Sequence, residues 1–209
     1  MDRLPEQTIA RLPVYLRCLS QARSIGMRVI NSLGIAQMAG TNAAQVRKDL
    51  SYLGELGTRG VGYDVGSLAE HISDVLGLET SRRVAIVGFG RLGRALVMYP
   101  GFDEHGFDFV AAFDADPARV RALPGGRSID VRSIDNLETD LVKLRVEIVL
   151  LTTPAQVAQE MALRVAAGGV HAILNFAPVV LELPADVKVR PVDLASELQV
   201  LSFHLARMT

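Results

Sequence analysis

The sequence predicts an α/β protein with two domains: an N-terminal winged helix-turn-helix domain and a Rossmann domain with a doubly wound parallel sheet. The first observation is that helical patterns fill the first part of the chain and precede a glycine-rich hairpin, which is the element order of a winged helix. The second is that short apolar runs alternate with helical stretches from Arg83 onward, which is typical of a parallel sheet. These patterns place the two domains at residues 1–78 and 79–209.

The charge distribution also divides the chain, at residue 63, before the end of the first predicted domain. The chain has 209 residues, of which 49% are hydrophobic and 22% charged, so it can bury a core. Its net charge of −1 conceals an asymmetry, because residues 1–63 hold 8 Lys and Arg against 4 Asp and Glu, while residues 64–209 hold 14 against 19. A basic first part and an acidic second part indicate two modules with different partners, and nucleic acid suits only the first.

Several classes of protein are excluded by what the sequence lacks. Cys18 is the only cysteine, so neither a disulfide framework nor a thiolate zinc cluster can form within one chain. The four histidines are scattered without ligand spacing, and we expect no metal. No apolar run reaches the roughly 18 residues of a membrane helix, and the N-terminus lacks a signal pattern. We therefore expect a cytoplasmic protein with no membrane partner.

In the first domain, apolar periodicity and capping residues predict four helices, over residues 8–23, 32–40, 43–53 and 66–76. The first helix has a core-facing apolar stripe formed by Ile9, Leu12, Leu16 and Leu19. We expect Pro13 in the first turn of its main part, where a proline costs nothing. The short turn Gly40-Thr41-Asn42 between the second and third helices completes a helix-turn-helix.

In the second domain, strands are predicted over residues 83–88, 107–113, 147–152 and 170–174, and helices over residues 91–98, 133–144 and 154–167. A last helix over residues 193–207 carries Leu194, Leu198, Leu201 and Leu205 on one stripe. This terminal amphipathic helix needs a groove to cover its apolar side.

The strongest motif is a glycine-rich loop that follows the first of these strands and opens a helix. Its residues are the candidate cofactor ligands Gly88, Phe89, Gly90, Arg91, Leu92 and Gly93. The first glycine allows a tight turn, the second lets the backbone approach a pyrophosphate, and the third lets helix and strand pack closely. Asp114 ends the next strand at about the 20-residue distance expected of an acid that binds ribose hydroxyls. Because a carboxylate there repels a 2′-phosphate, NAD(H) is favoured over NADP(H).

Two later loops at the carboxyl edge of the sheet offer further cofactor contacts, and their candidate residues are Thr152, Thr153, Pro154, Asn175, Phe176 and Ala177. Small and amide side chains of this kind suit a nicotinamide or a ribose. The same residues could instead form ordinary helix caps and turns.

No catalytic set accompanies the cofactor loop. A dehydrogenase needs an acid or base beside the reacting carbon, usually Lys, His or a Tyr-Lys pair. The only lysines of the second domain are Lys143 and Lys188, in stretches that we expect to be exposed, and we interpret His171 as a core histidine. The sequence therefore favours a sensor over an enzyme. Two alternatives stay open: an NAD-dependent oxidoreductase with an appended helical domain, and an interaction protein whose Rossmann domain is empty.

The third helix has the position of a recognition helix. Its polar side carries the candidate DNA contacts Gln45, Arg47, Lys48, Ser51 and Tyr52. Arginine and lysine at such positions can donate to guanine O6 and N7 in the major groove. Arg59 in the hairpin could enter a minor groove, where Gly60 allows close approach. A solvated helix face and an ordinary loop are the alternative.

Several motifs in order resemble the Rex family of redox-sensing transcriptional repressors, over about residues 8–205. They are Gln45-Val-Arg-Lys-Asp-Leu-Ser-Tyr52, Gly57-Thr-Arg-Gly-Val-Gly-Tyr63, Gly88-Phe-Gly-Arg-Leu-Gly93, Tyr99-Pro-Gly-Phe102, Ile173-Leu-Asn-Phe-Ala-Pro178 and Val192-Asp193-Leu194. The resemblance implies a homodimer whose last helix is exchanged between subunits. It also implies that NADH releases the protein from palindromic operator DNA, whereas NAD⁺ permits binding.

The resemblance also assigns roles to individual positions. Arg47 and Lys48 match the basic residues of the recognition helix, and Arg59, Gly60 and Tyr63 match the wing. A polar set that couples the nicotinamide to DNA binding is matched by Arg17, Tyr99 and Asp193.

Overall fold

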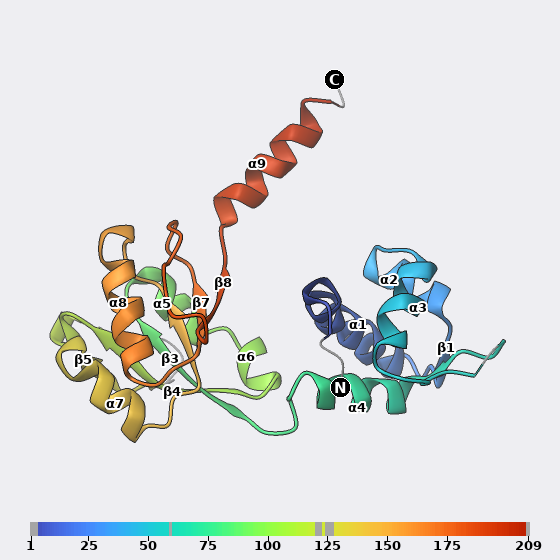
Figure 1. Ribbon diagram of the computed structural model, residues 1–209, viewed down its shortest axis with the longest axis horizontal. Coiled ribbons are helices and arrows are strands. Elements are labelled where there is room, and N and C mark those ends of the chain that lie inside the picture. The colour runs from blue at the N-terminus through green and yellow to red at the C-terminus, as the bar shows by residue number, and fades with distance from the viewer. Residues whose placement is uncertain (1–3, 59, 120–122, 124–127, 208–209) are drawn as a thin grey trace. The chain divides into compact units, whose positions relative to one another are not determined.

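The computed structural model describes residues 4–58, 60–119, 123 and 128–207. The chain forms two compact units, Met1–Thr80 and Ser81–Thr209, and each is described by itself (Figure 1). The mixed α/β class and the order of a helical unit before a parallel-sheet unit confirm the predicted fold class.

The first unit is a winged helix. Its elements are α1 (Glu6–Ser24), β1 (Val29–Ile30), α2 (Ser32–Ala39), α3 (Ala43–Ser51), β2 (Tyr63–Asp64) and α4 (Val65–Val75). The side chains of Asn31 and Asn42 cap α2 and α3 by accepting backbone N–H groups, and Gly40 ends α2 in the left-handed conformation. Strands β1 and β2 pair antiparallel and form the base of the wing.

The expectation for Pro13 is wrong, because α1 begins at Glu6 and Pro13 lies well inside the helix. A proline there cannot donate to the carbonyl of Ile9, and its exposed position lets water hydrate that carbonyl instead. The predicted stripe is also rotated, since Ile9 is 36% exposed. The buried face of α1 is formed by Thr8, Leu12, Tyr15, Cys18, Leu19 and Ala22.

The second unit contains a six-stranded sheet in the order β5-β4-β3-β6-β7-β8, and every neighbouring pair is parallel. The strands are β3 (Arg82–Val87), β4 (Phe107–Asp114), β5 (Val131–Ser133), β6 (Ile148–Leu151), β7 (Ala172–Asn175) and β8 (Lys188–Pro191). The first strand, β3, lies between β4 and β6, so the strand order reverses there. In doubly wound sheets a ligand binds at this reversal, outside the carboxyl ends of the strands.

Helices cover both faces of the sheet. They are α5 (Arg91–Val97), α6 (Gly101–Glu104), α7 (Leu137–Lys143) and α8 (Ala155–Ala167). The last helix, α9 (Leu194–Leu205), extends away from the sheet (Figure 1) and has no buried residue. Residues of α7 and α8 share one apolar core with the sheet, and residues of α5 and α6 share another. Two short 3₁₀ turns lie at Pro117–Arg119 and Ile134–Asn136.

Three differences from the predicted elements are local. The helix expected over residues 133–144 is shorter, because Val131–Ser133 forms the edge strand β5 and the α-helix begins at Leu137. Strand β8 and the short helix α6 were not predicted. The expectation that His171 is a core residue is wrong: its side chain is 60% exposed, and its Nδ1 lies 3.1 Å from an Asp186 oxygen.

Candidate nucleotide site and DNA-reading face

The three glycines of the nucleotide loop have three different surroundings. Gly88 has φ +95°, and a Cβ there would lie 2.9 Å from the Thr152 carbonyl carbon. A Cβ on Gly93 would lie 2.5 Å from the Gly88 carbonyl oxygen, so this glycine lets α5 pack on the loop. A Cβ on Gly90 would meet nothing within 4 Å. The open space lies at the glycine whose backbone would approach a pyrophosphate.

Asp114 lies at the end of β4 beside this loop. One carboxylate oxygen accepts the backbone N–H of Phe89 at 2.8 Å, and the other accepts the N–H of Asp116 at 3.0 Å. A carboxylate has about four acceptor sites, so these two bonds leave capacity for ribose hydroxyls. Asp114 therefore holds the loop and still offers acceptors to a ligand.

The two threonines of the loop after β6 have different surroundings: one is hydrogen-bonded within the protein and the other is free to bond a ligand. The Thr152 hydroxyl donates to the Gly88 carbonyl at 2.5 Å and so ties β6 to the glycine loop. The Thr153 hydroxyl is buried and has no hydrogen-bond partner in the described part of the chain. Buried polar groups are almost always paired, so this hydroxyl fits a hydrogen bond to a bound ligand. Pro154 precedes the first residue of α8.

The loop after β7 is held together by Asn175. The buried Asn175 amide donates to the carbonyls of Ala177 and Val179 at 3.1 and 3.0 Å and accepts the Ala177 N–H at 2.9 Å. The side chain is thus used within the turn, whereas the sequence suggested that it faces a ligand. Phe176 packs against the apolar core on the α5 side of the sheet.

These residues fit a dinucleotide. Open space at Gly90, the acceptor capacity of Asp114 and the unpaired Thr153 hydroxyl lie at or just beyond the carboxyl ends of β3, β4 and β6. In the described ranges there is no group of three or more His, Cys, Asp or Glu residues suited to a metal ion.

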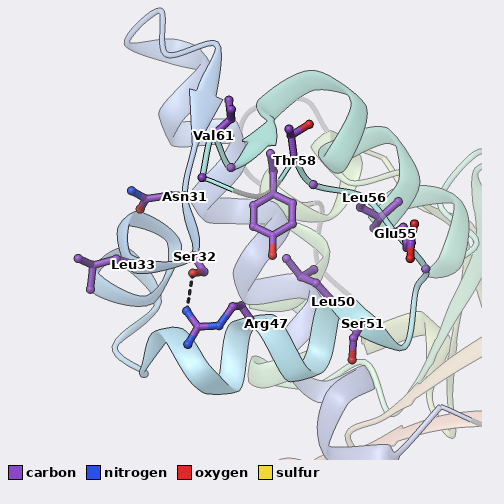
Figure 2. Close-up of a pocket in the computed structure, with 15 residues that line it drawn as sticks. Asn31, Ser32, Leu33, Arg47, Leu50, Ser51, Glu55, Leu56, Thr58 and Val61 are labelled. Atoms are coloured by element: carbon purple, nitrogen blue, oxygen red, sulfur yellow. Dashed lines mark hydrogen bonds between the residues drawn. The ribbon is translucent and has the colours of Figure 1, made fainter.

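The exposed face of α3 carries Arg47, Lys48 and Ser51. The Arg47 guanidinium donates to the Ser32 hydroxyl of α2 at 3.0 Å, as Figure 2 shows. Gln45 differs from the expectation because it is half-buried and its amide donates to Asp49 at 2.9 Å. Tyr52, just beyond the helix, is 47% exposed.

A groove of about 760 Å³ lies between α3 and the wing, with Arg47, Leu50, Ser51, Thr58, Val61 and Tyr63 among its lining residues (Figure 2). Gly57 and Gly62 permit the close packing of the wing, since a Cβ at Gly57 would lie 2.7 Å from the Tyr63 ring and one at Gly62 would lie 2.6 Å from the Ile30 carbonyl oxygen. Gly60 is exposed with φ +82°. Arg59 lies outside the described residues.

Sequence reasoning missed the role of Asp49, which is fully buried on α3 and accepts hydrogen bonds from Thr8, Arg11, Tyr15 and Gln45. Burial alone would raise the pKa of this carboxyl, but these hydrogen bonds outweigh it and lower the pKa to about 2. The signal was present in the sequence. Asp49 lies three residues after Val46 and next to Leu50, so its side chain had to share the apolar side of α3.

The three residues of the expected coupling set are all exposed. Arg17 belongs to α1 in the first unit, while Tyr99 and Asp193 belong to the second. The Tyr99 ring contacts Phe102 edge to face at a centroid distance of 5.4 Å. Asp193 caps α9 by accepting the Ser196 hydroxyl at 2.6 Å and the N–H groups of Ala195 and Ser196, which lowers its pKa.

Helix α9 has no buried residue. Six of its apolar residues are each more than half exposed: Leu194, Leu198, Val200, Leu201, Phe203 and Leu205. A contiguous exposed apolar surface of this kind typically marks a site of interaction with another surface. No helix of the described chain is long and apolar enough to cross a membrane.

A winged helix with exposed basic residues on its third helix, followed by a Rossmann unit with an open dinucleotide loop, defines a DNA-binding protein with a nucleotide-binding domain. Comparison with known proteins agrees. The family model described as putative DNA-binding protein N-terminus matches residues 3–51, and the one described as CoA binding domain matches residues 79–179.

Curated relatives and solved structures match nearly the whole chain. A redox-sensing transcriptional repressor Rex of Streptomyces griseus is 48% identical over 98% of this chain and 80% of its own length. One of Desulfitobacterium hafniense is 45% identical over 97% of this chain and 96% of its own length. The crystal structure of RSP with β-NAD⁺ and operator DNA matches with a TM-score of 0.91 and 30% identity, over 100% of this chain and 95% of that one. The chain belongs to the Rex family of redox-sensing transcriptional repressors.

Proposed function

We propose that the chain is a homodimeric repressor that binds palindromic double-stranded operator DNA and is released by NADH. The observation that carries the proposal is the open nucleotide loop at Gly90 on the same chain as the exposed basic face of α3. The solved relative RSP is described with β-NAD⁺ and operator DNA together and, separately, with β-NADH. This pairing supports DNA binding with the oxidised cofactor.

The proposed cofactor site is the glycine loop Gly88–Gly93 with residues from the neighbouring strand ends. Asp114 binds the adenosine ribose hydroxyls and disfavours a 2′-phosphate, so the cofactor is NAD(H). The Thr153 hydroxyl supplies a hydrogen bond inside the pocket. Thr152 and Asn175 act on the cofactor indirectly, since they hold the loops in place.

The proposed DNA contacts are made by α3 and the wing. Lys48 and Arg47 reach base edges in the major groove, Ser51 and Tyr52 contact the backbone, and the wing residues Arg59, Gly60 and Tyr63 lie over the minor groove. Gln45 acts chiefly by holding Asp49, so its contribution to base reading is small. Two recognition helices in a dimer read half-sites about 34–36 Å apart.

The proposed dimer uses the last helix. Its exposed apolar residues, within residues 193–207, would be covered by the partner subunit in an exchanged arrangement. Arg17, Tyr99 and Asp193 would then sense the nicotinamide, because the oxidised ring is cationic and the reduced ring is neutral. The cofactor can shift the dimer only through different affinities for its two states.

The relatives are named transcriptional repressors, and we infer that this chain likewise acts in the cytoplasm without catalysing a reaction. An oxidoreductase would require an acid or base at the nicotinamide. A turnover assay with NADH and small carbonyl substrates tests this point, and measurable turnover would favour the enzyme.

The proposal is tested by titrating NADH and NAD⁺ against the chain bound to a palindromic duplex that the chain itself selects from random DNA. Salt is held constant, since phosphate contacts make affinity strongly salt-dependent. Saturating NADH is expected to lower the affinity by about tenfold or more, while NAD⁺ leaves it unchanged or higher. Equal affinity with and without NADH would refute the sensor.

A further inference from the structure

Among the described residues, Asp49 is the only buried one that carries a charge, and its partners come from two helices. Four hydrogen bonds reach it from α1: the Thr8 hydroxyl at 2.9 Å, Arg11 Nε and Nη2 at 2.6 and 2.8 Å, and the Tyr15 hydroxyl at 2.7 Å. Gln45, one turn earlier on α3, supplies a fifth at 2.9 Å. The carboxylate of α3 is thus enclosed by donors that α1 places on one of its faces.

Asp49 and its α1 donors Thr8, Arg11 and Tyr15 form a polar joint between α3 and α1, while α3 also packs closely against α2. The polar link to α2 is a single bond between Arg47 and Ser32, both exposed or at the rim of the groove. The link to α1 is buried and includes a bidentate ion pair between Arg11 and Asp49. Charge-assisted hydrogen bonds are roughly twice as strong as hydrogen bonds between neutral groups. Arg47 and Lys48 directly precede Asp49, so any rotation of this joint moves both side chains.

The chain joins the first unit covalently to the nucleotide loop. Helix α1 packs against α4. The chain then runs from the end of α4 at Val75 through residues 76–81 into β3, and β3 ends directly at Gly88. Helix α4 is therefore the helix of the first unit nearest to the cofactor loop along the chain, and α1, which packs on α4, carries the donors to Asp49.

We propose that Asp49 is a positioning residue that makes the recognition helix α3 follow α1, so that a displacement of α1 and α4 driven by the cofactor unit reaches Arg47 and Lys48. The inference rests on the proposed function, in which NADH lowers operator affinity. Asp49 is then the residue that transmits the displacement of α1 to the DNA-contacting side chains of α3. Thr8, Arg11 and Tyr15 are the α1 side of the joint.

The test uses substitutions that remove one donor and keep the packing. Tyr15→Phe removes the hydroxyl and keeps the ring, and Thr8→Val removes the hydroxyl at nearly constant volume. Thr8→Ser keeps the donor and is expected to behave like wild type. Asp49→Asn removes the charge, and Asp74→Asn on the exposed side of α4 removes the same charge elsewhere in the unit. The last variant corrects for the effect of net charge on DNA affinity.

The measured quantity is the coupling ratio, which is the operator affinity without NADH divided by the affinity at saturating NADH. In Tyr15→Phe, Thr8→Val and Asp49→Asn this ratio is expected to shrink by about fivefold, with NADH affinity of the DNA-free protein unchanged. Thr8→Ser and Asp74→Asn are expected to keep the wild-type ratio. Thermal unfolding of each variant shows whether the first unit is intact.

The outcomes separate the two proposals. A wild-type ratio of one overturns the proposed function and the relay with it. A wild-type protein that responds to NADH, beside a folded Tyr15→Phe and Thr8→Val with the same ratio, overturns the relay alone. Equal losses of operator affinity with and without NADH would also overturn the relay, because they would show that the substitution only destabilises α3. If Asp49→Asn does not fold, Tyr15→Phe and Thr8→Val decide the matter.

Discussion

Single glycines in the nucleotide loop differ in what surrounds them, and this difference separates binding from stability. Gly93→Ala is expected to lower both NADH affinity and thermal stability, the latter by about 2 kcal/mol, because its Cβ would overlap the Gly88 carbonyl. Gly90→Ala has room in the free protein, so it is expected to unfold like wild type while NADH binds about tenfold more weakly. Fluorescence titration with NADH and calorimetric unfolding measure the two effects. Wild-type NADH affinity in Gly90→Ala would contradict the proposed position of the pyrophosphate.

Asp114 both holds the nucleotide loop and offers acceptors to a ligand. Asp114→Asn keeps an oxygen for the Phe89 N–H but replaces the charge and the acceptor of the Asp116 N–H, so we expect NADH to bind about tenfold more weakly. Discrimination against NADPH should shrink too, because the amide does not repel a 2′-phosphate. Titrations with both cofactors measure this change, and cofactor-free operator binding is the control. Parallel losses in cofactor and DNA binding would instead indicate a structural residue.

The buried Asp49 carboxylate predicts an acid-sensitive first unit. Its pKa is lowered from 3.8 to about 2 in the folded chain, so its ionised form favours folding above about pH 4. This contribution, about 2 kcal/mol, is lost as the pH falls from 4 toward 2. Amide hydrogen exchange of α1 and α3 across that range measures it. Asp49→Asn should lack this part of the pH dependence and Asp74→Asn should keep it; identical profiles in all three proteins would contradict the assignment.

At the scale of elements, the sequence predicted best where one local rule acts alone. The unit β3–loop–α5–β4 follows from a buried apolar run, three glycines and an acid at a set distance, and each of these has the expected place. Strands β5 and β8 escaped prediction because short strands at sheet edges need no apolar alternation. Their identity as strands comes from pairing with β4 and β7, which is a tertiary property.

The candidate site shows the same limit. Asn175 and Thr152 have side chains of the types that often bind ligands. In the structure these side chains hydrogen-bond to backbone groups instead: Asn175 to Val179 within its own turn, and Thr152 to Gly88, which is distant in sequence. Asp49 is the converse case, since its partners on α1 are more than 30 residues away and no local pattern reveals them. Residue type therefore indicated the candidate site residues. Only the packing of distant segments distinguished residues that hold the loops in place from residues free to contact a ligand.

The exposed apolar stripe of α9 predicts that this helix holds the dimer together. Leu201→Glu would place a charge in a buried interface, and a buried unpaired charge is strongly disfavoured, so the variant is expected to sediment as a monomer. Gln199→Glu adds the same charge to the same helix away from the leucine stripe and should remain dimeric. A dimeric Leu201→Glu protein at micromolar concentration would show that another surface forms the interface.

At the scale of the whole molecule, charge is divided within the first unit more than between the two units. Residues 1–63 hold 8 Lys and Arg against 4 Asp and Glu, but Asp64, Glu70, Asp74 and Glu79 bring residues 1–80 to 8 against 8. DNA phosphates attract Arg47 and Lys48 on α3 and repel the carboxylates of α4, so the first unit favours contact with the duplex through α3. The net charge of −1 thus conceals the basic segment that suits the chain to operator binding.

The same two-unit arrangement requires coupling in both directions. If NADH lowers operator affinity by a given factor, operator DNA must lower NADH affinity by the same factor, because the free, singly bound and doubly bound states form a closed thermodynamic cycle. A tenfold effect corresponds to about 1.4 kcal/mol of coupling free energy. Titrating NADH into the free chain and into the chain saturated with its palindromic duplex, at one salt concentration, measures the reciprocal factor. A scrambled duplex at the same concentration controls for non-specific charge effects. A lower NADH affinity on the operator would support the sensor, whereas an NADH affinity that the operator leaves unchanged would exclude any equilibrium effect of NADH on operator binding and refute the proposed function.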